Sequence, residues 1–245
     1  MQNHQYHSEK DVRDTITPHH HNVGAIIVAA GKSARMDGVD KVFASLAGKP
    51  MLTHVLGVFD SCPSVNQIVV VLNESNIKQG SELVKKQRYS KDIAVCIGGN
   101  LRQDSVAEGL KRLTDCRWVI IHDGARPCLS ADLIDKGLRE AKDSGAAIAA
   151  VPAKDTIKRV GTDMVIEDTP QREAIWMAQT PQIFRWEVIT KAYRRADCVG
   201  TDDAALVEAS GYKVKVYMGS YDNIKVTTPH DLAIAELILT QIKHR

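Results

Sequence analysis

Short apolar runs alternate with stretches of helical spacing along most of this chain, and no other feature constrains its fold as strongly. The runs occupy residues 24–30, 67–72, 92–97, 117–123, 145–152 and 212–218. Runs of this length that are rich in Val and Ile are typical of strands covered on both faces. Helical apolar spacing fills the gaps at 50–62, 73–87, 102–113 and 130–145. The alternation predicts an α/β fold with a doubly wound, mostly parallel sheet and right-handed crossovers.

Two segments fall outside this rhythm. A length of 245 residues suits one α/β domain with at most one elaboration, which we assign to 23–245. Residues 1–22 are polar, and we expect a disordered N-terminal tail there in spite of its short histidine tract. At about 153–178, two extended and charged pieces surround Gly161-Thr162-Asp163, which predicts a β-hairpin arm outside the main sheet. The apolar residues of such an arm need a partner, and a second subunit is a candidate.

Composition and charge argue against several classes of protein. The net charge of +2, from 32 basic and 30 acidic residues, is too close to neutral to favour nucleic acid or an anionic membrane as a partner. The five cysteines form no CxxC pair, which favours neither a disulfide framework nor a zinc site and fits a reducing cytoplasm. No apolar stretch approaches the roughly 20 residues that a membrane-spanning helix needs.

The loop after the first apolar run carries the first candidate binding residues. Its sequence, AAGKSARM at 29–36, matches neither a P-loop nor GxGxxG. The small residues Ala29, Ala30 and Gly31 allow backbone N–H groups to approach a phosphate closely. Cations follow at Lys32, Arg35 and Lys41. A triphosphate would neutralise this cluster, although a glycine-containing turn with solvated cations is the alternative.

The ends of the predicted strands are the other place where ligands are expected. Asp123 closes the run at 117–123, and Arg126 follows three residues on. A carboxylate here can hold Mg²⁺ or a substrate hydroxyl, whereas the alternative is a turn or helix cap. Lys225 stands in NIKVTTP, which reads as the end of a short apolar strand. An unpaired lysine there would be costly, which favours a functional role.

Several helix ends are marked by capping residues. Ser130 and Gly145 bound one helical stretch, and Thr228 precedes Pro229 at the start of the last one. The pair at 202–203, Asp202 and Asp203, is expected to be an N-terminal helix cap first and a ligand second.

Seven motifs, in order along the chain, resemble one family of enzymes. They are AAGKSARM with the following DKVF, GGNLRQDSV (98–106), HDGARP (122–127), DTIK (155–158), QREAIWMAQTPQIF (171–184), TDDAALVE (201–208) and NIKVTTPHDL (223–232). Together they resemble the small nucleotidyltransferases, and more closely the 2-C-methyl-D-erythritol 4-phosphate cytidylyltransferases, over essentially everything after residue 22. Two positions depart from the family pattern: Asp40 stands where Pro is usual, and Gly124 stands where Ala is usual.

The resemblance implies a Rossmann-like nucleotidyltransferase fold and transfer of CMP from CTP to 2-C-methyl-D-erythritol 4-phosphate. The products would be 4-CDP-2-C-methyl-D-erythritol and pyrophosphate, in the non-mevalonate route to isoprenoids. A phosphomonoester is already largely a dianion at neutral pH and needs no general base, so His122 is expected to be structural. The reaction needs relief from charge repulsion and in-line placement. Mg²⁺ is the expected cofactor, held mainly through the CTP phosphates, with Asp123 as the candidate protein ligand.

The resemblance also implies roles for individual residues. Backbone groups at Ala29, Ala30 and Gly31 would cradle the nucleotide. Contacts to cytosine and ribose fall on Gly98, Gly99, Arg102 and Ser105, which could instead form a tight turn and a helix start. The methylerythritol phosphate is expected to contact Asp123, Arg126, Thr156, Arg172, Thr180 and Lys225. The residues implied to be catalytic are Arg35, Lys41, Arg172 and Lys225.

Other readings remain open at this point. A ribitol 5-phosphate cytidylyltransferase shares much of the pattern, including NIKVTTP, while REAIWMAQTPQ and the AAG start favour methylerythritol phosphate. A sugar-nucleotide enzyme for a purine or uridine nucleotide is a weaker alternative, as is a nucleotide-binding module without catalysis. The resemblance further implies a homodimer through the arm, in which the neighbouring subunit supplies some of the arm residues to each site.

Overall fold

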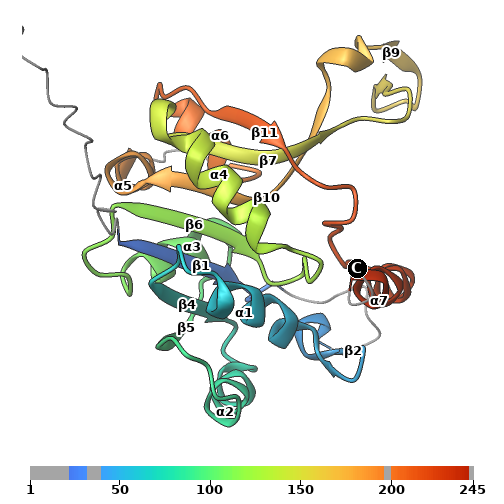
Figure 1. Ribbon diagram of the computed structural model, residues 1–245. Helices are drawn as coiled ribbons and strands as arrows, with labels where there is room; N and C mark the ends of the chain where they lie inside the picture. Colours follow the sequence, from blue (N-terminus) through green and yellow to red (C-terminus); the bar gives the residue numbers. More distant parts are fainter. Residues whose placement is uncertain (1–21, 32–39, 196–199, 243–245) are drawn as a thin grey trace, which may run out of the picture.

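The computed structural model describes residues 22–31, 40–195 and 200–242, so most of the predicted tail falls outside it, as does Arg35. Its centre is a seven-stranded sheet in the order β11-β7-β10-β6-β1-β4-β5 (Figure 1). The strands are β1 (Val23–Val28), β4 (Gln67–Leu72), β5 (Ile93–Ile97), β6 (Trp118–Asp123), β7 (Ala146–Pro152), β10 (Trp176–Arg185) and β11 (Lys215–Met218). Within this sheet, β10 runs antiparallel to β6 and β7, and the other neighbouring strands pair in parallel. The prediction of a mostly parallel α/β sheet is confirmed.

Helices cover both faces of this sheet. One buried cluster joins a face to α1 (Met51–Ser61), α2 (Ile77–Lys86), α4 (Ala131–Ser144) and α7 (Pro229–Ile242). A second cluster joins the opposite face to α3 (Arg102–Leu110), α5 (Trp186–Arg195) and α6 (Asp203–Ala209). Successive residues of β4 alternate between the two, with Ile68 and Val70 in the first cluster and Val69 and Val71 in the second. Both faces of the strand are therefore apolar, which is why the runs show no polar alternation.

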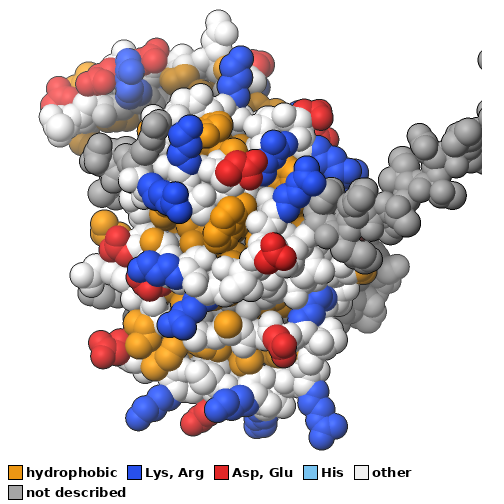
Figure 2. Space-filling model, turned by 90° about the vertical axis from the view of Figure 1, so that its left-hand side faces the viewer, with side chains coloured by type: hydrophobic (Ala, Val, Ile, Leu, Met, Phe, Trp, Pro, Cys, Tyr) orange, Lys and Arg blue, Asp and Glu red, His pale blue; other side chains and the backbone are white. Residues whose placement is uncertain are grey.

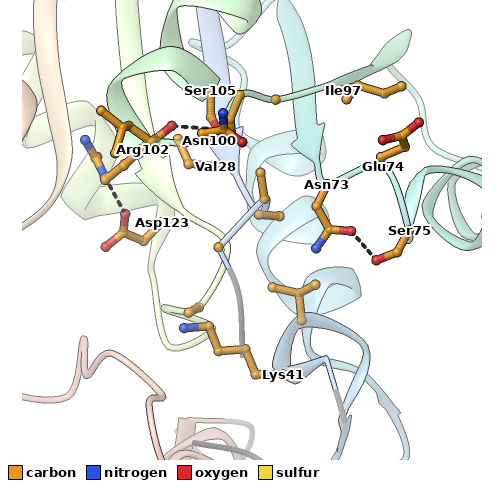
Figure 3. A pocket seen from close by; sticks show the side chains of 18 of the residues that line it. Val28, Lys41, Asn73, Glu74, Ser75, Ile97, Asn100, Arg102, Ser105 and Asp123 are labelled. Carbon is orange, nitrogen blue, oxygen red and sulfur yellow. Dashed lines mark hydrogen bonds and ion pairs between the residues drawn. The ribbon is translucent and has the colours of Figure 1, made fainter. Parts of the chain in front are cut away.

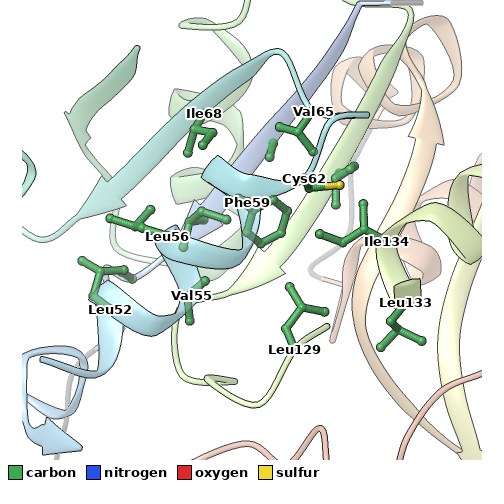
Figure 4. Close-up of a cluster of buried hydrophobic side chains, with 14 of the residues drawn as sticks. Leu52, Val55, Leu56, Phe59, Cys62, Val65, Ile68, Leu129, Leu133 and Ile134 are labelled. Atoms are coloured by element: carbon green, nitrogen blue, oxygen red, sulfur yellow. The ribbon is translucent and has the colours of Figure 1, made fainter. Parts of the chain in front are cut away.

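The first cluster is centred on α1 (Figure 4). Leu52, Leu56 and Phe59 of this helix are fully buried, and Ile134 of α4 is buried in the same cluster. Removing a side chain such as Phe59 from water contributes about 1.5–3 kcal/mol, which fixes the helix against the sheet.

The predicted caps of α4 are present. The Ser130 hydroxyl accepts from the Leu133 N–H at 3.4 Å, and Gly145 ends the helix in the left-handed conformation, with φ of 76°.

The hairpin predicted at 153–178 is shorter in the structure. β8 (Arg159–Val160) and β9 (Ile166–Asp168) form a two-stranded antiparallel sheet that stands away from the main sheet (Figure 1). Trp176, Met177 and Ala178, which the sequence placed in this arm, pair with β7 inside the main sheet. Pro181 lies within β10 although it has no N–H to donate to a neighbouring strand. A register shift between Ala178 and Gln182 accommodates it.

The surface mixes charges of both signs. Figure 2 shows Lys and Arg side chains interspersed with Asp, Glu and hydrophobic side chains on one face. Among the described residues, no helix combines the length and the apolar character that crossing a membrane requires.

Candidate active site

A cavity of about 760 Å³ lies at the carboxyl ends of β1, β4, β5 and β6 (Figure 3). This is the end of an open α/β sheet at which ligands bind. Most of the residues proposed for the site from the sequence line it: Ala29, Ala30, Gly31, Lys41, Gly98, Gly99, Arg102, Ser105, Asp123 and Lys225. Lys41 enters the cavity from the start of a short 3₁₀ helix, η1 (Lys41–Phe43). The structure therefore brings together segments that are nearly 200 residues apart in the sequence.

Four polar residues of the cavity wall were missed in the sequence, Asn100 in the turn after β5 and three consecutive residues after β4. Asn73, Glu74 and Ser75 follow directly after β4 and line the cavity. The sequence placed them in the helix predicted at 73–87, but α2 begins only at Ile77. Reading every strand end as a ligand position would have found them, because they occupy the same place after β4 that Asp123 occupies at the end of β6.

The turn after β5 packs closely against the first loop. A Cβ atom at Gly98 would lie 2.5 Å from the Ser105 hydroxyl oxygen and 2.9 Å from the Ala30 Cβ. Only glycine allows this approach without displacing the loop that starts at Ala29. Ser105 is buried and donates to the Leu101 carbonyl at 3.1 Å. The two predicted nucleotide-binding segments thus form one continuous wall.

Asp123 is the electrostatic centre of the cavity. Its carboxylate lies 2.8 Å from Lys225 Nζ, 3.4 Å from Arg102 Nε and 3.6 Å from Arg126 Nε. Burial acts to raise the pKa of Asp123, but Lys225 and Arg102 outweigh it and hold that pKa well below its usual range. Asp123 is therefore ionised, and it holds three cations together, of which Lys225 and Arg102 line the cavity.

Arg102 is held by a second carboxylate, which the sequence assigned to another role. Arg102 Nη2 lies 2.7 Å from Asp203 Oδ2, and Asp203 is fully buried. The Tyr193 hydroxyl donates to Asp203 Oδ1 at 2.6 Å. Burial acts to lower the pKa of Arg102, but the Asp203 and Asp123 carboxylates have the larger effect and raise that pKa above its ordinary value. Asp202 caps α6 as predicted, through the Ala205 N–H at 2.9 Å, while Asp203 is the buried partner of Arg102.

Thr180 was expected to contact substrate, but it is buried behind the cavity wall. Its hydroxyl accepts from the Asp123 backbone N–H at 3.0 Å and lies 3.0 Å from His122 Nδ1. His122 Nε2 lies 3.1 Å from the Arg126 carbonyl oxygen, which can only accept. The proton of neutral His122 is thus on Nε2, and Thr180 donates to Nδ1. Thr180 and His122 position Asp123, which agrees with the structural role expected for His122.

Arg126 and Lys225 connect β6 to the segment before α7. Arg126 is buried and donates to the Asn223 carbonyl at 2.8 Å, and the Val226 N–H donates to the Ala125 carbonyl at 2.8 Å. The strand predicted at Lys225 is wrong, because the residues from 224 to 227 have no regular secondary structure. Lys225 is instead half-exposed at the cavity and paired with Asp123.

Arg126, predicted to contact substrate, is buried beside Asp123 and, like Thr180, does not line the cavity. Three further predicted site residues are not brought to the cavity by the described part of the chain. Arg35 lies outside the described residues. Thr156 and Arg172 are exposed near the arm, where Arg172 begins η2 (Arg172–Ala174) and donates to the Lys154 carbonyl at 3.2 Å. Thr156 and Arg172 therefore do not line the cavity of their own chain.

Lowering the pH from 6.5 towards 4 is expected to destabilise the fold through His122. Burial lowers the pKa of His122 from 6.5 to about 4. In this window the unfolded chain binds a proton at His122 that the folded chain does not. The free energy of unfolding therefore decreases as the pH is lowered. The full shift corresponds to about 3 kcal/mol.

Urea unfolding at pH 7 and pH 4.5 measures this effect. His122→Gln should lose that share of the pH dependence, whereas the same change at the exposed His230 should not. An unchanged pH dependence in His122→Gln would contradict the assignment.

Comparisons with known proteins agree with this geometry. The family model described as IspD, 2-C-methyl-D-erythritol 4-phosphate cytidylyltransferase, matches residues 23–241. A protein of that name from Dehalococcoides mccartyi is 54% identical over 217 residues, covering 89% of this chain and 96% of the relative. One from Alkaliphilus metalliredigens is 46% identical over 228 residues, covering 90% and 94%. The crystal structure of 4-diphosphocytidyl-2C-methyl-D-erythritol synthase from Anaerococcus prevotii matches with a TM-score of 0.81 and 31% identity, over 90% of this chain and 97% of that one. The chain therefore belongs to the 2-C-methyl-D-erythritol 4-phosphate cytidylyltransferase family.

Proposed function

We propose that this chain transfers CMP from CTP to 2-C-methyl-D-erythritol 4-phosphate and releases pyrophosphate, in the cytoplasm, as a step of isoprenoid biosynthesis. The observation that carries the proposal is the strand-end cavity, where the loop at 29–31, Lys41 and Lys225 face one space. Its volume of about 760 Å³ lies in the range of small-molecule sites. The reaction is inferred from membership of the family, and its location is inferred from the cavity.

The chemistry requires two anionic groups to meet. A phosphate oxygen of methylerythritol phosphate attacks the α-phosphorus of CTP, and the bond to the β-phosphate oxygen breaks to release pyrophosphate. We assign Lys41, with Arg35, to the CTP phosphates, where their charges stabilise the transition state. Lys225 faces the incoming phosphate and is oriented by Asp123. None of these groups has to move a proton, since the nucleophile is already a dianion.

The nucleotide base is assigned to the wall formed by β5 and the start of α3. Ile97 and Leu101 are about half exposed and present apolar surface to the cavity. Gly98 lies close to Ser105 and Ala30 in this wall, and we propose that a pyrimidine fits against it better than the larger purine. Pyrophosphate release with CTP, compared with ATP and GTP, tests the assignment. We expect turnover with CTP only, and equal turnover with a purine nucleotide would contradict it.

Mg²⁺ is proposed as the cofactor, held mainly by the triphosphate. The described residues contain no cluster of three or more His, Cys, Asp or Glu side chains that could form a metal cage. Asp123 is the candidate protein ligand, although its oxygens already face three cations. A single carboxylate fits Mg²⁺, which usually keeps several waters and binds substrate phosphates. When bound, the ion neutralises part of the triphosphate charge.

A homodimer is proposed to complete the site. The arm carries exposed apolar side chains, with Met164 at 82%, Val165 at 59% and Ile166 at 56% exposure. Thr156 and Arg172 lie beside this arm and outside the cavity of their own chain. We assign them to the methylerythritol phosphate bound in the neighbouring subunit. This accounts for both the apolar arm and the placement of the two polar residues.

Charged substitutions on the arm are expected to separate the subunits. Replacing Met164 and Val165 with aspartate places two unpaired charges in an apolar contact, which is costly. Light scattering should then give the monomer mass, and turnover should fall. Leu237→Asp on α7, at 60% exposure, is the matched control and should leave the dimer intact. A dimer that survives the double substitution would contradict the arm as the interface.

Arg172→Ala is expected to weaken the use of methylerythritol phosphate. A hydrogen bond to a charged group contributes about 1.5–3 kcal/mol, so KM for this substrate should rise about tenfold to a hundredfold. KM for CTP should change little. Arg159→Ala, which replaces an exposed arginine of β8, serves as the control in steady-state kinetics. An unchanged KM for methylerythritol phosphate would remove Arg172 from the site.

A further inference from the structure

Asp40 directly precedes Lys41, and its carboxylate connects two segments that border the cavity. Oδ1 accepts a hydrogen bond from the Val42 backbone N–H at 3.2 Å and caps η1. Oδ2 accepts from the side-chain amide of Asn73 at 3.4 Å and from that of Asn76. The carboxylate therefore links the start of η1 to the connection between β4 and α2.

The Asn73 side chain is itself held in one orientation. Its Oδ1 accepts from the Ser75 hydroxyl at 2.7 Å (Figure 3) and from the Asn76 backbone N–H at 3.0 Å. The backbone N–H can only donate, so this position must be the amide oxygen, and Nδ2 faces Asp40. Asn73 and Ser75 line the cavity together with Lys41. The Asp40 connection thus joins two parts of the same cavity wall.

The backbone angle of Asp40 would also suit a proline. Its φ of −69° is close to the value of about −65° that a proline ring imposes. Proline would fix the turn covalently but has no side-chain acceptor. Asp40 keeps the same backbone angle and holds the turn by hydrogen bonds, which reach across to Asn73 and Asn76.

We propose that Asp40 is a positioning residue that holds Lys41 at the cavity through its bonds to Asn73 and Asn76. The inference rests on the role proposed above for Lys41. On the other side of Lys41, Val42 is buried in the core, so the residues flanking the lysine are both held. A group that acts in the transition state must be placed closely, because a misplacement of about 1 Å can lower the rate about a hundredfold.

Asp40→Ser separates the two functions of the carboxylate. A serine hydroxyl can still cap η1 but is too short to reach Asn73 and Asn76. We expect kcat to fall about tenfold, with KM for CTP changed less than about threefold, because the base-binding wall is untouched. Asn76→Ala removes a donor that does not line the cavity and should lower kcat in the same direction. This second variant keeps the test decisive if Asp40→Ser folds poorly.

Asp60→Ser is the matched control. Asp60 likewise accepts hydrogen bonds from a neighbouring segment, at Ser90 and Lys91, but lies away from the cavity. Its substitution should leave kcat at the wild-type value. The melting temperature of each variant is measured as well. The proposal predicts that the fall in kcat does not follow a loss of stability.

A double-mutant cycle tests whether Asp40 affects kcat through Lys41. In a Lys41→Ala background, Asp40→Ser should lower kcat no further, because the aspartate acts only through the lysine. An equal loss in both backgrounds, or wild-type kcat in Asp40→Ser and Asn76→Ala, would overturn the inference while leaving the proposed function intact. Full activity of Lys41→Ala alone would instead overturn the proposed role of Lys41.

Discussion

Replacing Lys41 with alanine is expected to lower kcat by about a hundredfold to a thousandfold, the range found when one preorganised donor to a transition state is removed. Lys41 lines the cavity at the start of η1, as do Asn73 and Ser75 after β4 (Figure 3). Negative charge accumulates on the α-phosphoryl oxygens as the nucleophile approaches, so a cation there matters more in the transition state than in the bound ground state. CTP binding should therefore be kept in part.

The measurement is kcat from pyrophosphate release at saturating substrates, with the dissociation constant of CTP from calorimetry. Lys49→Ala is the control, since Lys49 is an exposed lysine of β3 (Lys49–Pro50) outside the cavity. A Lys41→Ala enzyme with weaker CTP binding but wild-type kcat would show that Lys41 only binds the nucleotide.

Replacing Asp123 with asparagine is expected to cost both stability and activity. The variant leaves Arg102, Arg126 and Lys225 close together without their shared anion. Removing one partner of a buried ion pair typically costs 3–5 kcal/mol, and we expect about 3 kcal/mol here. The lower end applies because Lys225 is half-exposed and Arg102 keeps Asp203 as a partner.

The effect should depend on pH with a definite sign. The folded-state pKa of Asp123 is lowered, because Lys225 and Arg102 outweigh the effect of burial. Its stabilisation is therefore present above the unfolded pKa, near 3.9, and is lost as the pH falls below that value. Urea unfolding at pH 7 should show the full difference between wild type and Asp123→Asn. The exposed Asp92→Asn is the control, and an equal stability of all three proteins would contradict the account.

Much of the site could be predicted because parallel strands deliver their ends to one edge of the sheet. The apolar runs located β1, β5 and β6, and the residues after them proved to be cavity walls. Asn73 needed only the same rule applied to β4. What obscured it was helical spacing that appeared to begin at residue 73, four residues before α2 does.

The polar network behind the cavity could not be predicted from the sequence. Thr180 lies on β10, and whether its hydroxyl faces substrate or Asp123 depends on the pairing of β10 with β6. The neighbouring pairing of β10 with β7 shifts register between Ala178 and Gln182, around Pro181, and no local pattern encodes this arrangement. Asp203 likewise reads as a first-turn residue of a helix. Its burial against Arg102 arises only when the fold brings the first residue of α6 to the first residue of α3.

The most direct test of the central claim is pyrophosphate release from the purified protein with CTP and Mg²⁺. Two acceptors are compared, 2-C-methyl-D-erythritol 4-phosphate and ribitol 5-phosphate. We predict rapid release with methylerythritol phosphate and none above background with ribitol 5-phosphate. Release with ribitol 5-phosphate alone, or with neither acceptor, would contradict the proposed function.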